Sequence, residues 1–75
     1  MSNPLKILRY GDTLFADGLF RMHDEQGFPL AFSLAECRKR GLTPCLNQFR
    51  ADARKAGWDA DKTERVIKEA EADAQ

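Results

Sequence analysis

The chain has 75 residues, enough for one small domain and too few for two, so we treat residues 1–75 as a single domain. Its 12 basic and 12 acidic residues balance, so the basic excess typical of nucleic-acid-binding domains is absent. No apolar stretch approaches the roughly 20 residues of a membrane-spanning helix, and no secretion signal is recognised, so we expect a cytoplasmic protein that does not enter a membrane. Residues 1–3 and 71–75 are expected to fray.

The first predicted element is an amphipathic helix over residues 4–25. Apolar residues and glycines recur in this range at three- and four-residue steps, which is the pattern of a helix with one buried face. A β-hairpin is the alternative, with strands at 6–10 and 13–16 joined by Gly11-Asp12, a pair that suits a two-residue turn. We prefer the helix because its apolar stripe continues past the second strand without a break.

Two further helices are predicted at residues 29–40 and 44–56, on either side of a tight corner. Gly41 can adopt the left-handed backbone that ends a helix, because it has no Cβ. Thr43 can then cap the next helix with its hydroxyl, and Pro44 fits the first helical position, where no N–H is needed.

A fourth helix is predicted at residues 60–72. Gly57, Trp58 and Asp59 repeat the arrangement of the preceding corner, with a glycine, an apolar anchor and a polar cap. The corner that begins at Gly27 is of the same kind. These signals predict an all-α fold, a compact bundle of four short helices with glycine-led tight corners.

Few residues indicate chemistry. Cys37 and Cys45 would need two more ligands at suitable spacing to hold a metal, and His23 is the single histidine. The sequence has no CxxC pair, no phosphate-binding loop and no nucleophile elbow. We therefore predict a protein that is not an enzyme, with no metal and no cofactor, in which both cysteines are structural thiols.

The basic segment 38–55 could instead contact DNA. The predicted second helix, the glycine turn and the third helix form the outline of a helix-turn-helix motif. Its candidate DNA-binding residues are Arg38, Lys39, Arg40, Arg50, Arg54 and Lys55. The match is partial, because the motif calls for apolar residues where this chain has Glu36, Arg40, Asn47 and Arg50. The other interpretation is that these charges form solvated helix faces.

Three aromatic residues lie off the predicted core stripes, namely Tyr10, Phe20 and Phe32. An exposed aromatic cluster would mark a surface for a partner protein. Alternatively, these rings fill the flanks of the core. A 75-residue domain also has a marginal core, so a homodimer is a further expectation.

Three stretches combine short helices with glycine-led corners: Gly27-Phe28-Pro29-Leu30, Cys37–Pro44, and Phe49…Asp52-Ala53…Ala56-Gly57-Trp58. Across about residues 12–70 the chain resembles the small helical proteins of phages and prophages that have no assigned activity. The resemblance implies an accessory or regulatory role in a bacterial host or phage-infected cell, with no catalytic residues. We therefore expect an accessory protein that binds a partner protein; a DNA-binding regulator is the alternative.

Overall fold

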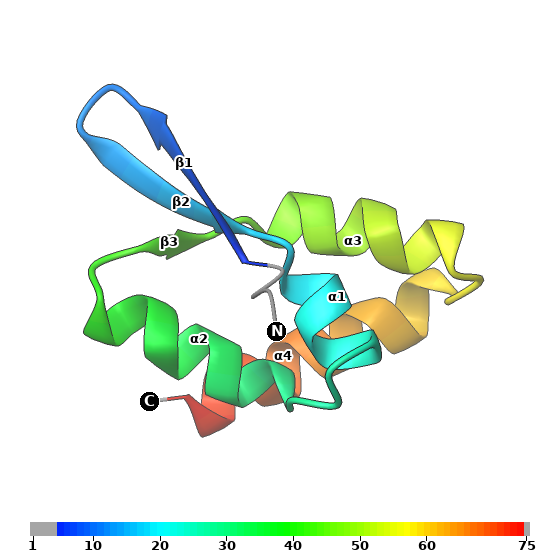
Figure 1. The fold of residues 1–75 in the computed structure, drawn as a ribbon. Helices are drawn as coiled ribbons and strands as arrows, with labels where there is room; N and C mark the ends of the chain where they lie inside the picture. Colours follow the sequence, from blue (N-terminus) through cyan, green and yellow to red (C-terminus); the bar gives the residue numbers. More distant parts are fainter. Residues whose placement is uncertain (1–4, 75) are drawn as a thin grey trace.

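The computed structural model describes residues 5–74, which form a three-stranded sheet and four helices (Figure 1). The elements in chain order are β1 (Lys6–Tyr10), β2 (Thr13–Asp17), α1 (Leu19–Asp24), α2 (Leu30–Lys39), β3 (Thr43–Pro44), α3 (Leu46–Lys55) and α4 (Ala60–Asp73). β2 lies between its neighbours, antiparallel to β1 and parallel to β3. The prediction of an all-α bundle of four helices is therefore wrong, because the chain forms a mixed sheet together with its helices.

The predicted helix over residues 4–25 is replaced by the hairpin β1–β2 and the short helix α1. Gly11 has φ +62° and Gly18 has φ +85°, left-handed values that interrupt a right-handed helix. Asp12 has a negative φ, so Gly11-Asp12 follows the pattern of a type II′ turn and brings Tyr10 opposite Thr13. The hairpin alternative is the arrangement that the structure shows, with its second strand one residue longer than expected.

The predicted glycine-led ends of α2 and α3 are confirmed. At the end of α2, Gly41 has φ +70°, Leu42 N donates to Cys37 O at 2.7 Å, and Gly41 N donates to Arg38 O at 3.2 Å. These two bonds are the Schellman pattern, which satisfies carbonyls left unpaired at a helix end. The corner at Gly57 makes the same pair of bonds at the end of α3.

The predicted start of the third helix is wrong. Thr43 and Pro44 form β3 alongside β2, and Cys45 N donates to Ala16 O at 2.9 Å. α3 then begins two residues later than predicted, with Cys45 as a cap that makes no side-chain hydrogen bond. The local sequence favoured a helix start here, but Thr43 and Pro44 pair with β2 instead. Proline is tolerated in this position because β3 is an edge strand.

The last helix agrees with its prediction. Asp59 Oδ1 accepts a hydrogen bond from Lys62 N at 2.7 Å, which caps α4. α4 extends to Asp73. The fraying expected at residues 71–75 stays a prediction, and that expected at residues 1–3 falls outside the described range. No helix in the described range is long and apolar enough to cross a membrane.

The core lies among the four helices. Phe20, Phe49 and Trp58 come from α1, α3 and the corner before α4, and their rings meet edge to face at centroid distances of 5.2–6.0 Å. Ile67 of α4 and Leu34 of α2 are buried in the same cluster. The hairpin contributes little to this core, since Ala16 is its one fully buried residue among those described.

Candidate functional site

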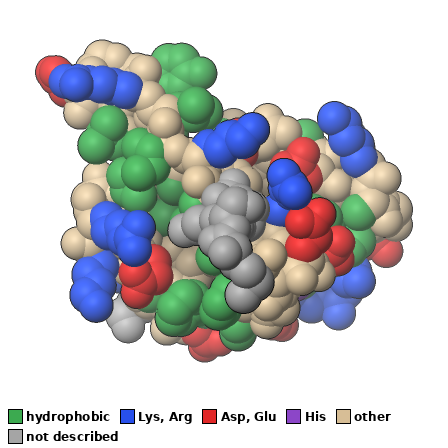
Figure 2. Space-filling view, in the orientation of Figure 1, with side chains coloured by type: hydrophobic (Ala, Val, Ile, Leu, Met, Phe, Trp, Pro, Cys, Tyr) green, Lys and Arg blue, Asp and Glu red, His purple; other side chains and the backbone are tan. Residues whose placement is uncertain are grey.

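The β1–β2 hairpin projects beyond the helices (Figure 1). Its side chains Ile7, Tyr10 and Leu14 are 58%, 66% and 38% exposed, although all three are large and apolar or aromatic. We call these three residues the hairpin patch. Figure 2 shows hydrophobic side chains gathered at this projecting end, with a basic and an acidic side chain at its tip.

The hairpin patch occupies both faces of the hairpin, because neighbouring residues of a strand point to opposite sides. Ile7 pairs with Ala16, and Leu14 pairs with Arg9, so the side chains of Ile7 and Leu14 share one face. Tyr10 lies on the other face, where its ring meets Phe15 edge to face at 5.7 Å. A partner that covered both apolar faces would have to receive the hairpin in a groove.

The outer edge of β1 has no neighbouring strand in the described part of the chain. Ala16 O accepts a hydrogen bond from Cys45 N, so the backbone N–H and C=O of Ala16 face β3 rather than β1. Ile7 lies opposite Ala16 in the antiparallel ladder, and such a pair without mutual hydrogen bonds directs the N–H and C=O of Ile7 away from β2. The same alternation turns the backbone of Arg9 outward and that of Leu8 and Tyr10 inward. β1 therefore presents an open edge at two residues.

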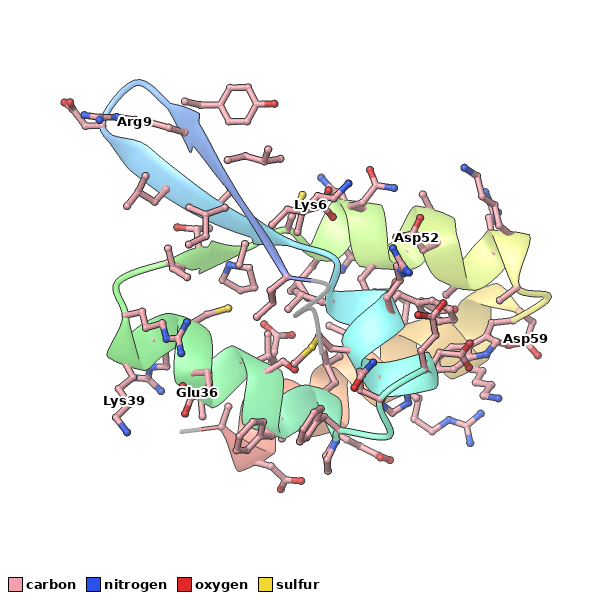
Figure 3. All side chains as sticks on the ribbon, viewed as in Figure 1. Lys6, Arg9, Glu36, Lys39, Asp52 and Asp59 are labelled. Atoms are coloured by element: carbon pink, nitrogen blue, oxygen red, sulfur yellow. The ribbon has the colours of Figure 1, made fainter. Side chains whose placement is uncertain are left out.

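The hairpin carries two basic and two acidic side chains. Arg9 lies at the tip, where its Nε donates to Gly11 O at 3.2 Å, and Lys6 lies at the base (Figure 3). Asp12 and Asp17 balance these charges. Both basic residues belong to β1, so its open edge has a positive charge at each end.

The three predicted aromatic site residues do not form one patch. Tyr10 is exposed on the hairpin, whereas Phe20 is 6% exposed and packs on Phe49 at 5.4 Å. Phe32 is 47% exposed, but it stacks on Phe28 at 5.3 Å near the start of α2, at the other side of the molecule from the hairpin (Figure 1). Phe20 is therefore a core residue, and Tyr10 and Phe32 lie on separate surfaces.

The predicted DNA-binding residues divide between α2 and α3, and several have partners. Arg38 Nη1 donates to Ala74 O at 3.2 Å, and Arg40 Nε lies 3.7 Å from Glu36 Oε2 in an ion pair. Lys39, Arg54 and Lys55 have no ion-pair partner among the described residues. The connection between the two helices runs through β3, so it lacks the short turn of a helix-turn-helix motif.

Arg50 belongs to a polar bridge between α3 and α4. Its Nε and Nη2 donate to the Glu64 carboxylate at 2.7 and 3.2 Å, and its Nη1 donates to Asn47 Oδ1 at 3.0 Å. The hydrogen bond from Arg50 lowers the pKa of Glu64 and raises the pKa of Arg50 itself. The three bridge residues line a pocket of about 360 Å³, together with Arg54 and Ala60 among others.

The remaining reactive side chains do not converge. Both cysteines are free thiols; Cys37 is buried, and burial raises its pKa, while Cys45 is half-buried at the start of α3. His23 Nδ1 lies 3.0 Å from Phe28 O. In residues 5–74 no three His, Cys, Asp or Glu side chains lie close enough together to hold a metal ion.

Sequence reasoning missed Ile7, Leu14 and Phe28 as exposed apolar residues. A strand pattern places Ile7 and Leu14 on one face of the hairpin, so the signal was present in the hairpin alternative. The helical interpretation assigned the same two residues to a buried stripe.

Comparison with known proteins finds a partial similarity. The chain is 41% identical to a segment of the alanine–tRNA ligase of Polaromonas naphthalenivorans (strain CJ2), in a match that covers 61% of this chain. The chain spans about 7% of the length of that ligase. No family model and no solved structure matches the chain.

Proposed function

We propose that this chain is a non-enzymatic accessory protein that binds a partner protein through its projecting hairpin. The observation that carries the proposal is the exposure of Ile7, Tyr10 and Leu14 on a hairpin that the helices do not cover. When a partner covers large apolar side chains and removes them from water, the burial favours binding by roughly 25 cal/mol per Å² of apolar area.

The shape of the hairpin supports the same proposal. Its two faces both expose large side chains, and its edge offers backbone groups for strand addition. A partner with an apolar groove next to a strand could use both features together. The four helices α1–α4, which we call the helical body, would then serve as a base that holds the hairpin away from the rest of the surface.

A comparative capture experiment tests this proposal. The immobilised wild-type chain, an Ile7→Thr/Leu14→Thr variant and a Phe32→Gln variant are exposed to one bacterial lysate, and retained proteins are compared by mass spectrometry. Thr is β-branched and favours strand backbone, so it suits both positions while it removes apolar area. We expect one set of proteins to be retained by the wild type and the Phe32→Gln variant and lost with the hairpin variant.

Circular dichroism shows in the same experiment whether each variant is folded. Retention of the same proteins by a folded hairpin variant would overturn the proposal. Loss of binding with Phe32→Gln alone would place the binding surface at the Phe28–Phe32 stack instead.

Nucleic-acid binding is the second candidate function. It is favoured by the similarity to a segment of a protein named as a tRNA ligase, and by the exposed cations Lys39, Arg54 and Lys55. Binding through phosphate contacts weakens steeply as salt rises. A gel shift on random duplex DNA and on tRNA at low and moderate salt tests it, with Arg54→Ala/Lys55→Ala as the variant. Absence of a shift at low salt removes this candidate.

A further inference from the structure

We propose that the open edge of β1 pairs with β1 of a second copy of this chain, antiparallel and centred on Leu8. This inference goes beyond the proposed function. That function rests on the exposed side chains of the hairpin patch and uses the edge only as a further contact, whereas the pairing rests on the outward backbone groups of Ile7 and Arg9. Two copies would join their sheets into one continuous sheet with a twofold axis at Leu8.

The backbone of β1 fits this register. Ile7 and Arg9 direct their N–H and C=O outward, as the contact of Ala16 with β3 requires. In a pairing centred on Leu8, Ile7 of one copy lies opposite Arg9 of the other, so outward groups meet outward groups. Leu8 of one copy lies opposite Leu8 of the other, and these two residues exchange no backbone hydrogen bonds. In antiparallel sheets the side chains of such pairs approach each other most closely.

The side chains also fit this register. Lys6 lies opposite Tyr10 of the second copy, which places an ammonium beside an aromatic ring, and Leu8 lies opposite Leu8. Arg9 lies opposite Ile7, so no two like charges are directly opposed. A register centred on Arg9 would instead oppose two guanidinium groups, which is unfavourable.

The edge lacks two of the features that usually prevent such pairing, a proline and a bulge. β1 contains no proline, and its ladder with β2 is regular from Lys6 to Tyr10 without a bulge. Its charges are confined to Lys6 and Arg9, and the register centred on Leu8 separates the charges of the two copies. A five-residue strand pair buries less surface than a permanent dimer needs, so we expect association that depends on concentration in the accessible range.

A cysteine scan reads this register directly. Single substitutions Lys6→Cys, Ile7→Cys, Leu8→Cys and Arg9→Cys are made in a Cys45→Ser background and oxidised with glutathione disulfide. Opposed residues at Leu8 bring their Cα atoms to about 4.5 Å, within reach of a disulfide, whereas the two copies of Lys6 are separated by about 13 Å. We expect a disulfide-linked dimer from Leu8→Cys and a monomer from Lys6→Cys.

Sedimentation of variants at the outward position tests the pairing without a cross-link. Ile7→Pro removes an outward N–H while leaving the ladder with β2 intact, and Ile7→Thr keeps the N–H as its matched control. The twofold axis doubles the loss, so we expect dimerisation to weaken at least about tenfold for Ile7→Pro and to persist for Ile7→Thr. The wild-type mass should rise from 8.5 kDa toward twice that value as concentration increases.

Four results would overturn the inference. The wild type could stay at 8.5 kDa at millimolar concentration. All four cysteine positions could cross-link equally, which indicates random collision, or Ile7→Cys or Arg9→Cys could cross-link best, which indicates another register. The wild type could also remain a monomer and retain a lysate protein that Ile7→Pro loses and Ile7→Thr keeps. That result would mean that the edge of β1 pairs with a strand of another protein.

Discussion

In the helical body, Phe49 and Ile67 are almost fully buried among four helices, whereas in the hairpin Ile7 and Tyr10 remain mostly in solvent. Each large side chain that is fully buried contributes about 1.5–3 kcal/mol to folding, so the stability of the chain resides mainly in its body. A two-stranded hairpin is marginal by itself in water and here depends on its attachment through β3 and α1. The comparison separates a part that folds the chain from a part whose apolar side chains remain available for binding.

The largest expected effect is in the body. Phe49 contacts the rings of Phe20, Trp58 and His23, so Phe49→Ala leaves a cavity and should lower the free energy of unfolding by about 3–5 kcal/mol. A domain of this length has only roughly 4–11 kcal/mol in total. Urea unfolding followed by circular dichroism measures the change, with Phe49→Leu as a control that keeps most of the volume. A loss below about 1 kcal/mol would mean that the core is elsewhere.

A smaller effect separates two glycines with left-handed backbones. Gly41 ends α2 in the body and Gly11 turns the hairpin, and in both the space around an added Cβ is open, so the cost of alanine comes from φ alone. Gly41→Ala should lower the global free energy of unfolding by about 1–2 kcal/mol. Gly11→Ala should instead increase amide exchange within the hairpin and leave the urea midpoint nearly unchanged. Equal shifts of the midpoint would show that the hairpin and the body unfold as one unit.

The hairpin patch should have still less influence on stability. Ile7→Thr and Leu14→Thr replace exposed side chains, so each should change the free energy of unfolding by no more than about 0.5 kcal/mol. The same variants are expected to abolish partner binding, which makes binding and stability separable at these two residues. A large loss of stability in the urea measurement would place their side chains in the folding core.

The smallest effect is expected at the Arg50–Glu64 bridge, where both side chains are substantially exposed. The folded-state pKa of Glu64 is lowered, so the bridge stabilises the fold above the unfolded value of about 4.3, and this contribution is lost as pH falls through the folded value. The wild type should therefore lose its small advantage over Glu64→Gln as pH falls below about 4.3. Thermal unfolding at a series of pH values tests this, and an advantage that grows as pH falls would contradict it.

Local sequence signals predicted α2, α4 and the glycine-led helix ends, but they failed for the hairpin and for the start of α3. The corners at Gly41 and Gly57 and the cap at Asp59 depend on local chemistry, and the structure has them where local signals predicted. Residues 6–17 carried two periodicities at once, since the same apolar residues recur at helical steps and also alternate in two strands. The hairpin is distinguished from the helix by the positive φ of Gly11 and Gly18. Glycine can adopt a positive φ but does not have to, so the sequence does not decide between the two structures.

The site was predicted less well than the body because exposure depends on tertiary neighbours. Tyr10 and Phe32 are exposed as expected, but Phe20 is buried because α1 turns it into the core. The pairing of Thr43 and Pro44 with β2 joins segments about 28 residues apart, and no local pattern indicates it. That pairing separates α2 from α3 and thereby removes the tight turn on which the DNA-binding interpretation depended.

Amide hydrogen exchange measured by NMR at residues 7–10 tests the central claim, an open-edged hairpin outside the core, most directly. In dilute protein, the inward amides of Leu8 and Tyr10 should exchange slowly relative to the outward amides of Ile7 and Arg9. Protection of Ile7 and Arg9 should then increase as the protein is concentrated. Equal protection of all four amides at every concentration would contradict the account, because a helix or a covered edge would give that result.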